Sequence, residues 1–263
     1  MSRKLLRGGL SLAVDDAGGA GKPVIFQHGL GGDARQTEEA LPSHPALRRI
    51  TLECRGHGRS PAGAASIALF AEDVAALVES LPRPVALGGI SMGAAIALRL
   101  AVTRPGMVAA LVLVRPAWIA GPAPPNMAPV AEVAALLARL PADEARVAFA
   151  SSEMARRLAA EAPDNLASLD GYFDREPREE TARLLAAIAA DGPGITEDQI
   201  AALRLPTLVC GSEEDAIHPM PVAERLAALI PGAWLVRLPP KGRDRAAHFA
   251  ALHAAISAFL RES

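Results

Sequence analysis

The sequence predicts an α/β protein with a doubly wound, mostly parallel sheet and a helical lid inserted after the strand at residues 109–114. Short apolar runs alternate with helical patterns through most of the chain, as expected for a sheet with helices on both faces. The runs are continuous rather than alternating, which is typical of strands covered on both sides. Roughly 90 residues after residue 114 carry only helical periodicity, and these predict the inserted lid.

The individual elements follow from the same patterns. Apolar runs bounded by Pro, Gly or charge predict strands at 22–27, 48–53, 83–89, 109–114, 205–211 and 233–238, and helical patterns lie at 66–81, 91–104, 221–230 and 245–260. The N-terminal stretch is interrupted by Gly8 and Gly9 and followed by two aspartates, which is unlike a signal peptide and favours a first strand. We expect a core of residues 1–114 and 206–263 and a cap of residues 115–205.

Composition excludes several classes of function. The 263 residues include 27 basic and 29 acidic side chains, a net charge of −2, with no run of like charge. This balance argues against a nucleic-acid binder. Cys54 and Cys210 are far apart and predict neither a disulfide framework nor a zinc site. No stretch reaches the ~18 apolar residues of a membrane span. We therefore expect a cytoplasmic protein whose partner is a small molecule or another protein. The small-molecule substrate, and the absence of a metal or cofactor, are expected from the motifs described next.

The segment VALGGISMGAAIAL (85–98) contains the pattern G-x-S-x-G around Ser91. It passes from a predicted strand to a predicted helix, which is the context that this motif requires. A sharp turn there forces the serine into a strained backbone conformation, so Gly89 and Gly93 must be small to let the two arms approach. The serine hydroxyl then lies beside a helix N-terminus, where negative charge is favoured. Ser91 is the predicted nucleophile.

A second loop, HGLGG (28–32), follows the strand at 22–27. Its glycines leave backbone N–H groups uncovered, and such groups can bind a developing oxyanion. We expect the backbone amides of Leu30 and Met92 to be the two donors.

At this point the chain resembles the α/β-hydrolase superfamily, in particular bacterial esterases and 3-oxoadipate enol-lactonase-like hydrolases. The matching motifs are HGLGG, ECRGHGRS, GISMG and GSEEDAIHP, in the order of the family and across the whole chain. One departure is Glu53, where the family usually has aspartate. The resemblance implies a structural role for His57 and a supporting role for His28 in the oxyanion loop, and we place His28 at the substrate-binding site. It implies no cofactor.

Asp215 matches the acid of this family, four residues before Pro219, and leaves the end of a strand that can fix its position. Glu213 and Glu214 are adjacent carboxylates, and a solvated acidic turn is the alternative. His218 follows so closely that we expect it to line the loop. The chain order Ser, Asp, His then leaves two histidines, His248 and His253, after the last strand.

Two accounts of the base compete. The register of the family places a histidine near Arg243, and the usual Gly-His pair is absent. Either the loop is longer and His248 still reaches Ser91, or the base is lost and His248 is an ordinary helix residue. His248 lies in the first turn of its helix, where a histidine stays neutral, whereas His253 lies in the middle. We select His248.

The predicted lid is mostly apolar, which favours a small to medium, largely uncharged substrate. Trp118 is either a wall of the substrate pocket or part of the buried core. The sequence thus predicts a serine hydrolase of esters or lactones that acts through an acyl-enzyme, with Ser91, His248 and Asp215 as catalytic residues. A C–C hydrolase or a cofactor-free haloperoxidase would use the same residues. A non-catalytic binding protein on this scaffold is the alternative if the base is missing.

Overall fold

The computed structural model describes residues 2–41, 44–82 and 84–262. Within these ranges, eight strands form one sheet in the order β1-β2-β4-β3-β5-β6-β7-β8. The strands are β1 (Ser2–Arg7), β2 (Leu10–Asp16), β3 (Lys22–Gln27), β4 (Leu47–Leu52), β5 (Val85–Ile90), β6 (Val108–Val114), β7 (Thr207–Ser212) and β8 (Trp234–Leu238). Residue 83, the first of the strand predicted at 83–89, lies outside the described residues.

Strands β3 to β8 pair in parallel, and only β1 and β2 run antiparallel to their neighbours. This confirms the mostly parallel α/β sheet. The prediction of a single N-terminal strand was wrong, because β1 and β2 form a hairpin. Its two-residue loop is Gly8-Gly9, and both residues have positive φ, at 53° and 79°. Two such residues are what the tightest hairpin turns require, and glycine takes them up without strain.

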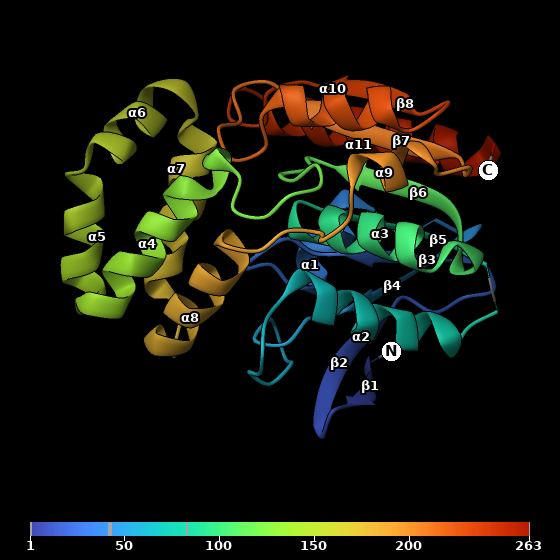
Figure 1. Ribbon diagram of the computed structural model, residues 1–263, viewed down its shortest axis with the longest axis horizontal. Helices are drawn as coiled ribbons and strands as arrows, with labels where there is room; N and C mark the ends of the chain where they lie inside the picture. Colours follow the sequence, from blue (N-terminus) through green and yellow to red (C-terminus); the bar gives the residue numbers. More distant parts are fainter. Residues whose placement is uncertain (1, 42–43, 83, 263) are drawn as a thin grey trace.

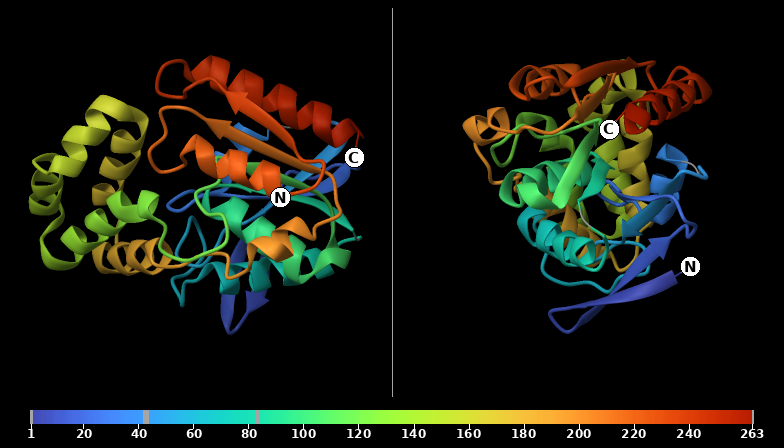
Figure 2. Two further views of the ribbon diagram at one scale, coloured as in Figure 1. Left: turned by 45° about the horizontal axis from the view of Figure 1, so that its top comes forward. Right: turned by 90° about the vertical axis from the view of Figure 1, so that its right-hand side faces the viewer.

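Helices cover both faces of the sheet (Figures 1 and 2). α2 (Ile67–Glu79), α3 (Met92–Thr103) and α10 (Met220–Leu229) pack on one face, where they share the larger apolar core. α1 (Ala34–Ala40) and α11 (Arg245–Glu262) pack on the other, around a smaller cluster that includes Phe26, Val112 and Ile256. In the right-hand view of Figure 2, α11 (red) lies opposite α10, α2 and α3. The parallel strands are therefore covered on both sides, as their continuous apolar runs predicted.

A group of helices between β6 and β7 stands apart from the sheet (Figure 1). These are α4 (Ala128–Arg139), α5 (Ala142–Ala150), α6 (Glu153–Glu161), α7 (Pro163–Asp170) and α8 (Arg178–Ala189), and we call them the inserted helices. Their buried side chains, among them Val133, Phe149 and Leu185, continue the larger core. α9 (Glu197–Ala201) follows and contacts α10. In the described part of the chain, no helix has the length and apolarity needed to cross a membrane.

Candidate functional site

Ser91 occupies a strained turn between β5 and α3. Its backbone angles are φ 54° and ψ −111°, outside the regions that residues with a side chain prefer. Such a conformation costs on the order of 1–3 kcal/mol and persists only where the surrounding structure enforces it. The Ser91 N–H donates to the carbonyl of Val114, at the end of neighbouring β6, over 3.0 Å. The sheet thus fixes the serine at the carboxyl ends of two adjacent strands.

The glycines on either side of Ser91 allow this turn to close. A Cβ on Gly89 would lie 2.5 Å from the carbonyl carbon of Gly93, and one on Gly93 would overlap the carbonyl of Gln27. Real Cβ atoms do not approach other atoms this closely, so neither position accepts a side chain without movement of the backbone. The expectation that the residues at positions 89 and 93 must be small, so that the strand and the helix can approach, is confirmed.

The two expected oxyanion donors lie in the loops after β3 and β5. Met92 is the first residue of α3, where a helix leaves its N–H groups without an internal acceptor. Among the described residues, neither the Met92 nor the Leu30 amide has a hydrogen-bond acceptor. The two loops are in contact, since a Cβ on Gly29 would lie 3.5 Å from the Cβ of Ser91. The two amides without acceptors therefore lie in the two loops that meet at the serine.

His28 holds the first of these loops in shape. Its ring donates from Nδ1 to the carbonyl of Gly29 over 2.8 Å and accepts at Nε2 from the Cys54 N–H over 3.0 Å. Burial lowers the pKa of His28, so the ring is neutral at pH 7. The side chain is fully buried and packs against the ring of His57 in a tilted arrangement. The supporting role is therefore the one that the structure gives His28, and neither ring nitrogen is available to a substrate.

The bond from His28 also orients the Leu30 amide. In a trans peptide the C=O of one residue and the N–H of the next point in opposite directions. The carbonyl of Gly29 accepts from His28 and from the Gly32 N–H at 3.0 Å, which fixes the peptide plane that it shares with the Leu30 N–H. The Gly29 N–H itself donates to Gln36 Oε1 at 2.7 Å. Hydrogen bonds within the protein therefore fix the direction in which the Leu30 N–H points.

The inserted helices contact the same loop from outside. The Tyr172 hydroxyl donates to the carbonyl of Leu30 at 2.9 Å, and the Arg175 guanidinium donates to the carbonyl of Gly31. Burial raises the pKa of Tyr172 to about 12, so its hydroxyl keeps its proton. Arg175 also lines a cavity of about 510 Å³ between the loop after β4 and α8. The segment between α7 and α8 therefore holds the loop at residues 28–32 in place.

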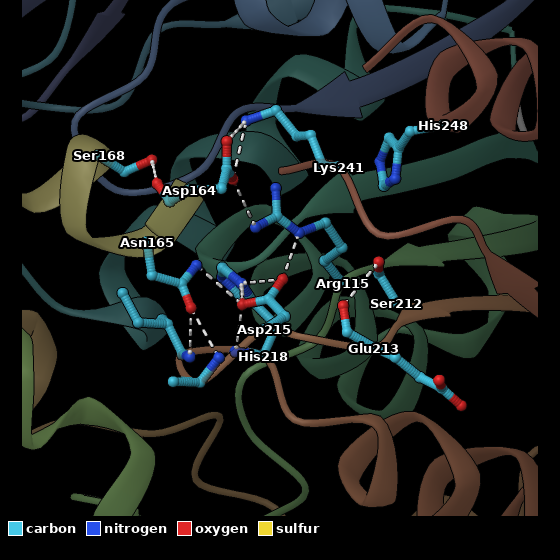
Figure 3. A network of polar contacts seen from close by, with 12 residues as sticks. Arg115, Asp164, Asn165, Ser168, Ser212, Glu213, Asp215, His218, Lys241 and His248 are labelled. Atoms are coloured by element: carbon cyan, nitrogen blue, oxygen red, sulfur yellow. Dashed lines mark hydrogen bonds and ion pairs between the residues drawn. The ribbon is translucent and has the colours of Figure 1, made fainter. Parts of the chain in front are cut away.

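Asp215 follows β7 and lies at the centre of a polar network (Figure 3). Its carboxylate accepts from Arg115 Nε at 2.6 Å, from Asn165 Nδ2 at 3.0 Å, and from His218 through both the ring and the backbone N–H. Burial alone would raise the pKa of this carboxyl, but the charge and hydrogen bonds of His218 and Arg115 hold it well below its usual range. Asp215 is therefore ionised at neutral pH.

His248 does not contact Asp215. It lies in the first turn of α11, as expected, but its Nδ1 is 2.8 Å from the carbonyl of Pro239 and its side chain is buried. In Figure 3 its ring lies apart from the carboxylate, and no dashed line joins the two. The prediction that His248 approaches Asp215 was therefore wrong, because its ring is hydrogen-bonded to the carbonyl of Pro239, the residue that follows β8. The hydroxyl of Ser91 has no hydrogen-bond partner in the described ranges.

His218, and not His248, makes the contact with Asp215 that was expected of the base. Its Nδ1 lies 2.9 and 3.0 Å from the two carboxylate oxygens of Asp215, three residues before it. Burial lowers the pKa of His218, and the attraction of Asp215 offsets this only in part, so the ring is neutral near pH 7. Nε2 has no partner among the described residues. A neutral imidazole oriented by a carboxylate at one nitrogen can accept a proton at the other.

The other residues considered from the sequence lie away from this network. Arg243 pairs with Glu214, and His253 lies within 2.7 Å of the carbonyl of Glu39. Trp118 is 1% exposed and donates from its indole nitrogen to the carbonyl of Asp191, so it belongs to the buried core and not to a pocket wall.

Sequence reasoning missed Arg115 and Asn165. Arg115 directly follows β6 with φ 45°, and the sheet places it between Ser91 and Asp215 because β6 lies between β5 and β7. Its position after a predicted strand was a usable signal. Asn165 comes from α7, fifty residues before Asp215, and no local pattern marks it. Among the described residues, no group of His, Cys, Asp and Glu side chains is arranged to hold a metal ion.

Comparison with known proteins matches this architecture. The model of the family described as "Alpha/beta hydrolase family" matches residues 24–259. RutD of Variovorax paradoxus (strain S110), named as a proposed carbamate hydrolase, is 32% identical over 239 residues, which cover 84% of this chain and 85% of that protein.

Solved structures extend the likeness to the whole chain. An esterase from Thermogutta terrifontis superposes with a TM-score of 0.75 at 25% identity, over 100% of this chain and 98% of that chain. An enol-lactonase from Burkholderia xenovorans LB400 superposes with a TM-score of 0.71 at 22% identity, over 97% and 98%. At such identity the second likeness shows the fold alone.

Proposed function

The chain belongs to the alpha/beta hydrolase family, and from that membership we propose that it cleaves a small to medium carboxylic ester or lactone through an acyl-enzyme on Ser91. The observation that carries this proposal is the strained turn at Ser91, flanked by two backbone amides without acceptors. A structure that maintains this strain and leaves two donors uncovered beside a hydroxyl suits attack on a carbonyl group.

In the proposed reaction the Ser91 hydroxyl attacks the substrate carbonyl carbon and loses its proton to a histidine. The amides of Leu30 and Met92 stabilise the negative charge on the carbonyl oxygen. We assign the histidine as His218, because it is the imidazole that Asp215 holds. The same ring returns the proton to the leaving group, and water then cleaves the acyl-enzyme by the reverse steps.

The proposed substrate class rests on the relatives and on the inserted helices. The esterase and the enol-lactonase share the fold over nearly the whole chain. RutD adds carbamates, whose carbonyl carbon is attacked in the same way. The inserted helices contribute mainly apolar residues to the core and clamp the oxyanion loop, which favours an uncharged acyl group beneath a cap.

A second candidate is a non-catalytic binding protein on the same scaffold. The observation that favours it is the hydrogen bond from Arg115 Nε to Asp215 Oδ2 at 2.6 Å, which places a guanidinium beside the carboxylate. A guanidinium stays protonated and cannot act as a base. If His218 serves only to complete the loop, Ser91 has no base and the protein would bind an ester without turning it over.

Labelling with a fluorophosphonate probe separates the two candidates. We expect the folded protein to be labelled at Ser91, and Ser91→Ala to remove both the label and the hydrolysis of esters, with a loss of at least about 10³-fold in kcat. A panel of esters, lactones and carbamates of graded acyl length, followed by product release, would then identify the substrate class. Binding of panel members without label or turnover would support the second candidate.

A further inference from the structure

The first turn of α7 contacts the acid side of the site through two adjacent residues, Asp164 and Asn165. Both belong to the inserted helices, yet their partners lie on three loops of the sheet, after β6, after β7 and after β8 (Figure 3). No other pair of adjacent residues in the described part of the inserted helices reaches all three loops through side-chain hydrogen bonds or ion pairs.

Asn165 is the better defined of the two. Its Nδ2 donates to Asp215 Oδ1 at 3.0 Å, and its Oδ1 accepts from the backbone N–H groups of Ala216 at 2.6 Å and Ile217 at 3.2 Å. The side chain is 1% exposed. Donor and acceptor ends of one buried amide are therefore both engaged on three consecutive residues of the loop that carries the acid.

This pairing requires an amide. A carboxylate at the same place would set a second negative charge against Asp215. An apolar side chain would leave the N–H groups of Ala216 and Ile217 without this acceptor and would remove one of the hydrogen bonds to Asp215 Oδ1. Buried groups left unpaired in this way are costly, so the loop would move to find new partners. The orientation of the Asp215 carboxylate therefore depends on the amide of Asn165.

Asp164 balances the charge around this contact. It accepts from Lys241 Nζ at 3.0 and 3.1 Å and lies 3.6 Å from Arg115, which in turn binds Asp215. Two cations and two carboxylates thus alternate in the order Lys241, Asp164, Arg115, Asp215, and the neutral ring of His218 lies beside Asp215. The net charge at the acid changes if any one member is replaced.

We propose that Asn165 is a positioning residue for Asp215 and His218, through which the inserted helices set the orientation and the proton affinity of the pair. The inference rests on the proposed function for its kinetic consequence, but its electrostatic consequence can be measured without turnover. Asn126 provides a matched control. Its Nδ2 donates to the carbonyls of Ala117 and Ile217, so it ties the same loop down without touching Asp215.

The first experiment compares Asn165→Ala with Asn126→Ala on the best ester of the panel. We expect Asn165→Ala to lower kcat by about 10- to 100-fold with a much smaller change in KM, because misplaced groups slow the chemical step more than binding. Asn126→Ala should change both constants less than about 3-fold. Equal losses in the two variants would show that Asn165 only tethers the loop, and would overturn the proposal.

The second experiment uses Asn165→Asp, which keeps the shape of the side chain, and Asn126→Asp, which adds the same charge nearby. Titration of the His218 ring by NMR should show its pKa raised in Asn165→Asp by about one unit or more, since a new negative charge beside Asp215 favours the protonated ring. Asn126→Asp should leave it within a few tenths of the unaltered protein. An equal or absent shift would contradict the inference, whatever the activity.

The two experiments also separate this inference from the function proposed for Ser91. If Ser91→Ala retained full turnover while Asn165→Asp still shifted the titration of His218, the function would be wrong and the inference correct. If Ser91 is labelled but the two asparagine sites behave alike, the function stands and the inference fails.

Discussion

The two halves of the candidate site, the nucleophile side around Ser91 and the acid side around Asp215, consist of different kinds of chemical groups. Around Ser91 the functional groups are backbone amides, and neutral side chains such as His28 and Gln36 hold them. Around Asp215 the functional groups are side chains, and Arg115 and Asn165 from separate segments hold them. Arg115 is also part of a series of ion pairs that continues through Asp164 to Lys241. Backbone amides can move only when the backbone that carries them moves. In contrast, any change of charge near Asp215 alters the proton affinity of the groups there. The first half should therefore respond to shape and the second to electrostatics.

The largest expected effect tests which histidine completes the acid side. His218→Ala should lower kcat by about 10³-fold, because Ser91 without a base is a weak nucleophile at neutral pH. In the same variant, the pH profile should no longer show the fall in activity at low pH that reflects protonation of His218. Initial rates between pH 4 and 9 would measure both.

His248→Ala is the matched variant for this test. Its ring contacts the carbonyl of Pro239, so we expect the pH profile to keep its acid limb and kcat to change far less. A 10³-fold loss and a vanished limb in His248→Ala, together with a mild effect of His218→Ala, would restore His248 as the base.

The next effect tests whether the nucleophile side responds to shape. Gly93→Ala places a Cβ against the carbonyl of Gln27, and backbone atoms cannot yield to it without shifting β3 or α3. The free energy of unfolding should fall by about 2–4 kcal/mol, as for other steric conflicts in a packed core.

Urea unfolding measures this change, with Gly106→Ala as the control. A Cβ at Gly106 meets nothing within 4 Å, and its φ is not positive. That variant should stay within about 0.5 kcal/mol of the unaltered protein. Equal stability of the two variants would mean that the turn at Ser91 is less constrained than its geometry indicates.

The smallest effect tests whether the acid side responds to charge. Arg115 is one of the groups that lower the pKa of His218, after burial. The ring must be neutral to accept a proton, so activity is lost as the pH falls through its pKa. Arg115→Gln removes a positive charge, raises that pKa and should move the acid limb to higher pH by about one unit or less.

Arg243→Gln is the control for this shift. Arg243 is exposed and pairs with Glu214, so its loss should leave the limb in place. A limb that moves equally in both variants would indicate a general effect of net charge and not the contact between Arg115 and Asp215.

The sequence predicted one side of the site better than the other, for a physical reason. A sharp turn or an uncovered amide requires glycine at a particular spacing, so Gly89, Gly93 and the loop at 28–32 are visible in the printed sequence. Charged side chains are common at every surface, and nothing local shows that Asn165 meets Asp215. His248 was preferred because the order of the family requires a histidine after β8. The order of residues along the chain could not show that the His248 ring would be hydrogen-bonded to the carbonyl of Pro239.

In the proposed reaction, the two hydrogen bonds accepted by the carbonyl of Gly29 have a kinetic consequence. When charge develops on an oxygen in water, surrounding dipoles must turn toward it, and this reorganisation is a large share of the barrier. The Leu30 N–H has already been turned, because His28 and the Gly32 N–H hold the far end of its peptide plane. The work of aligning that dipole was done once, during folding, and need not be repeated in each catalytic cycle.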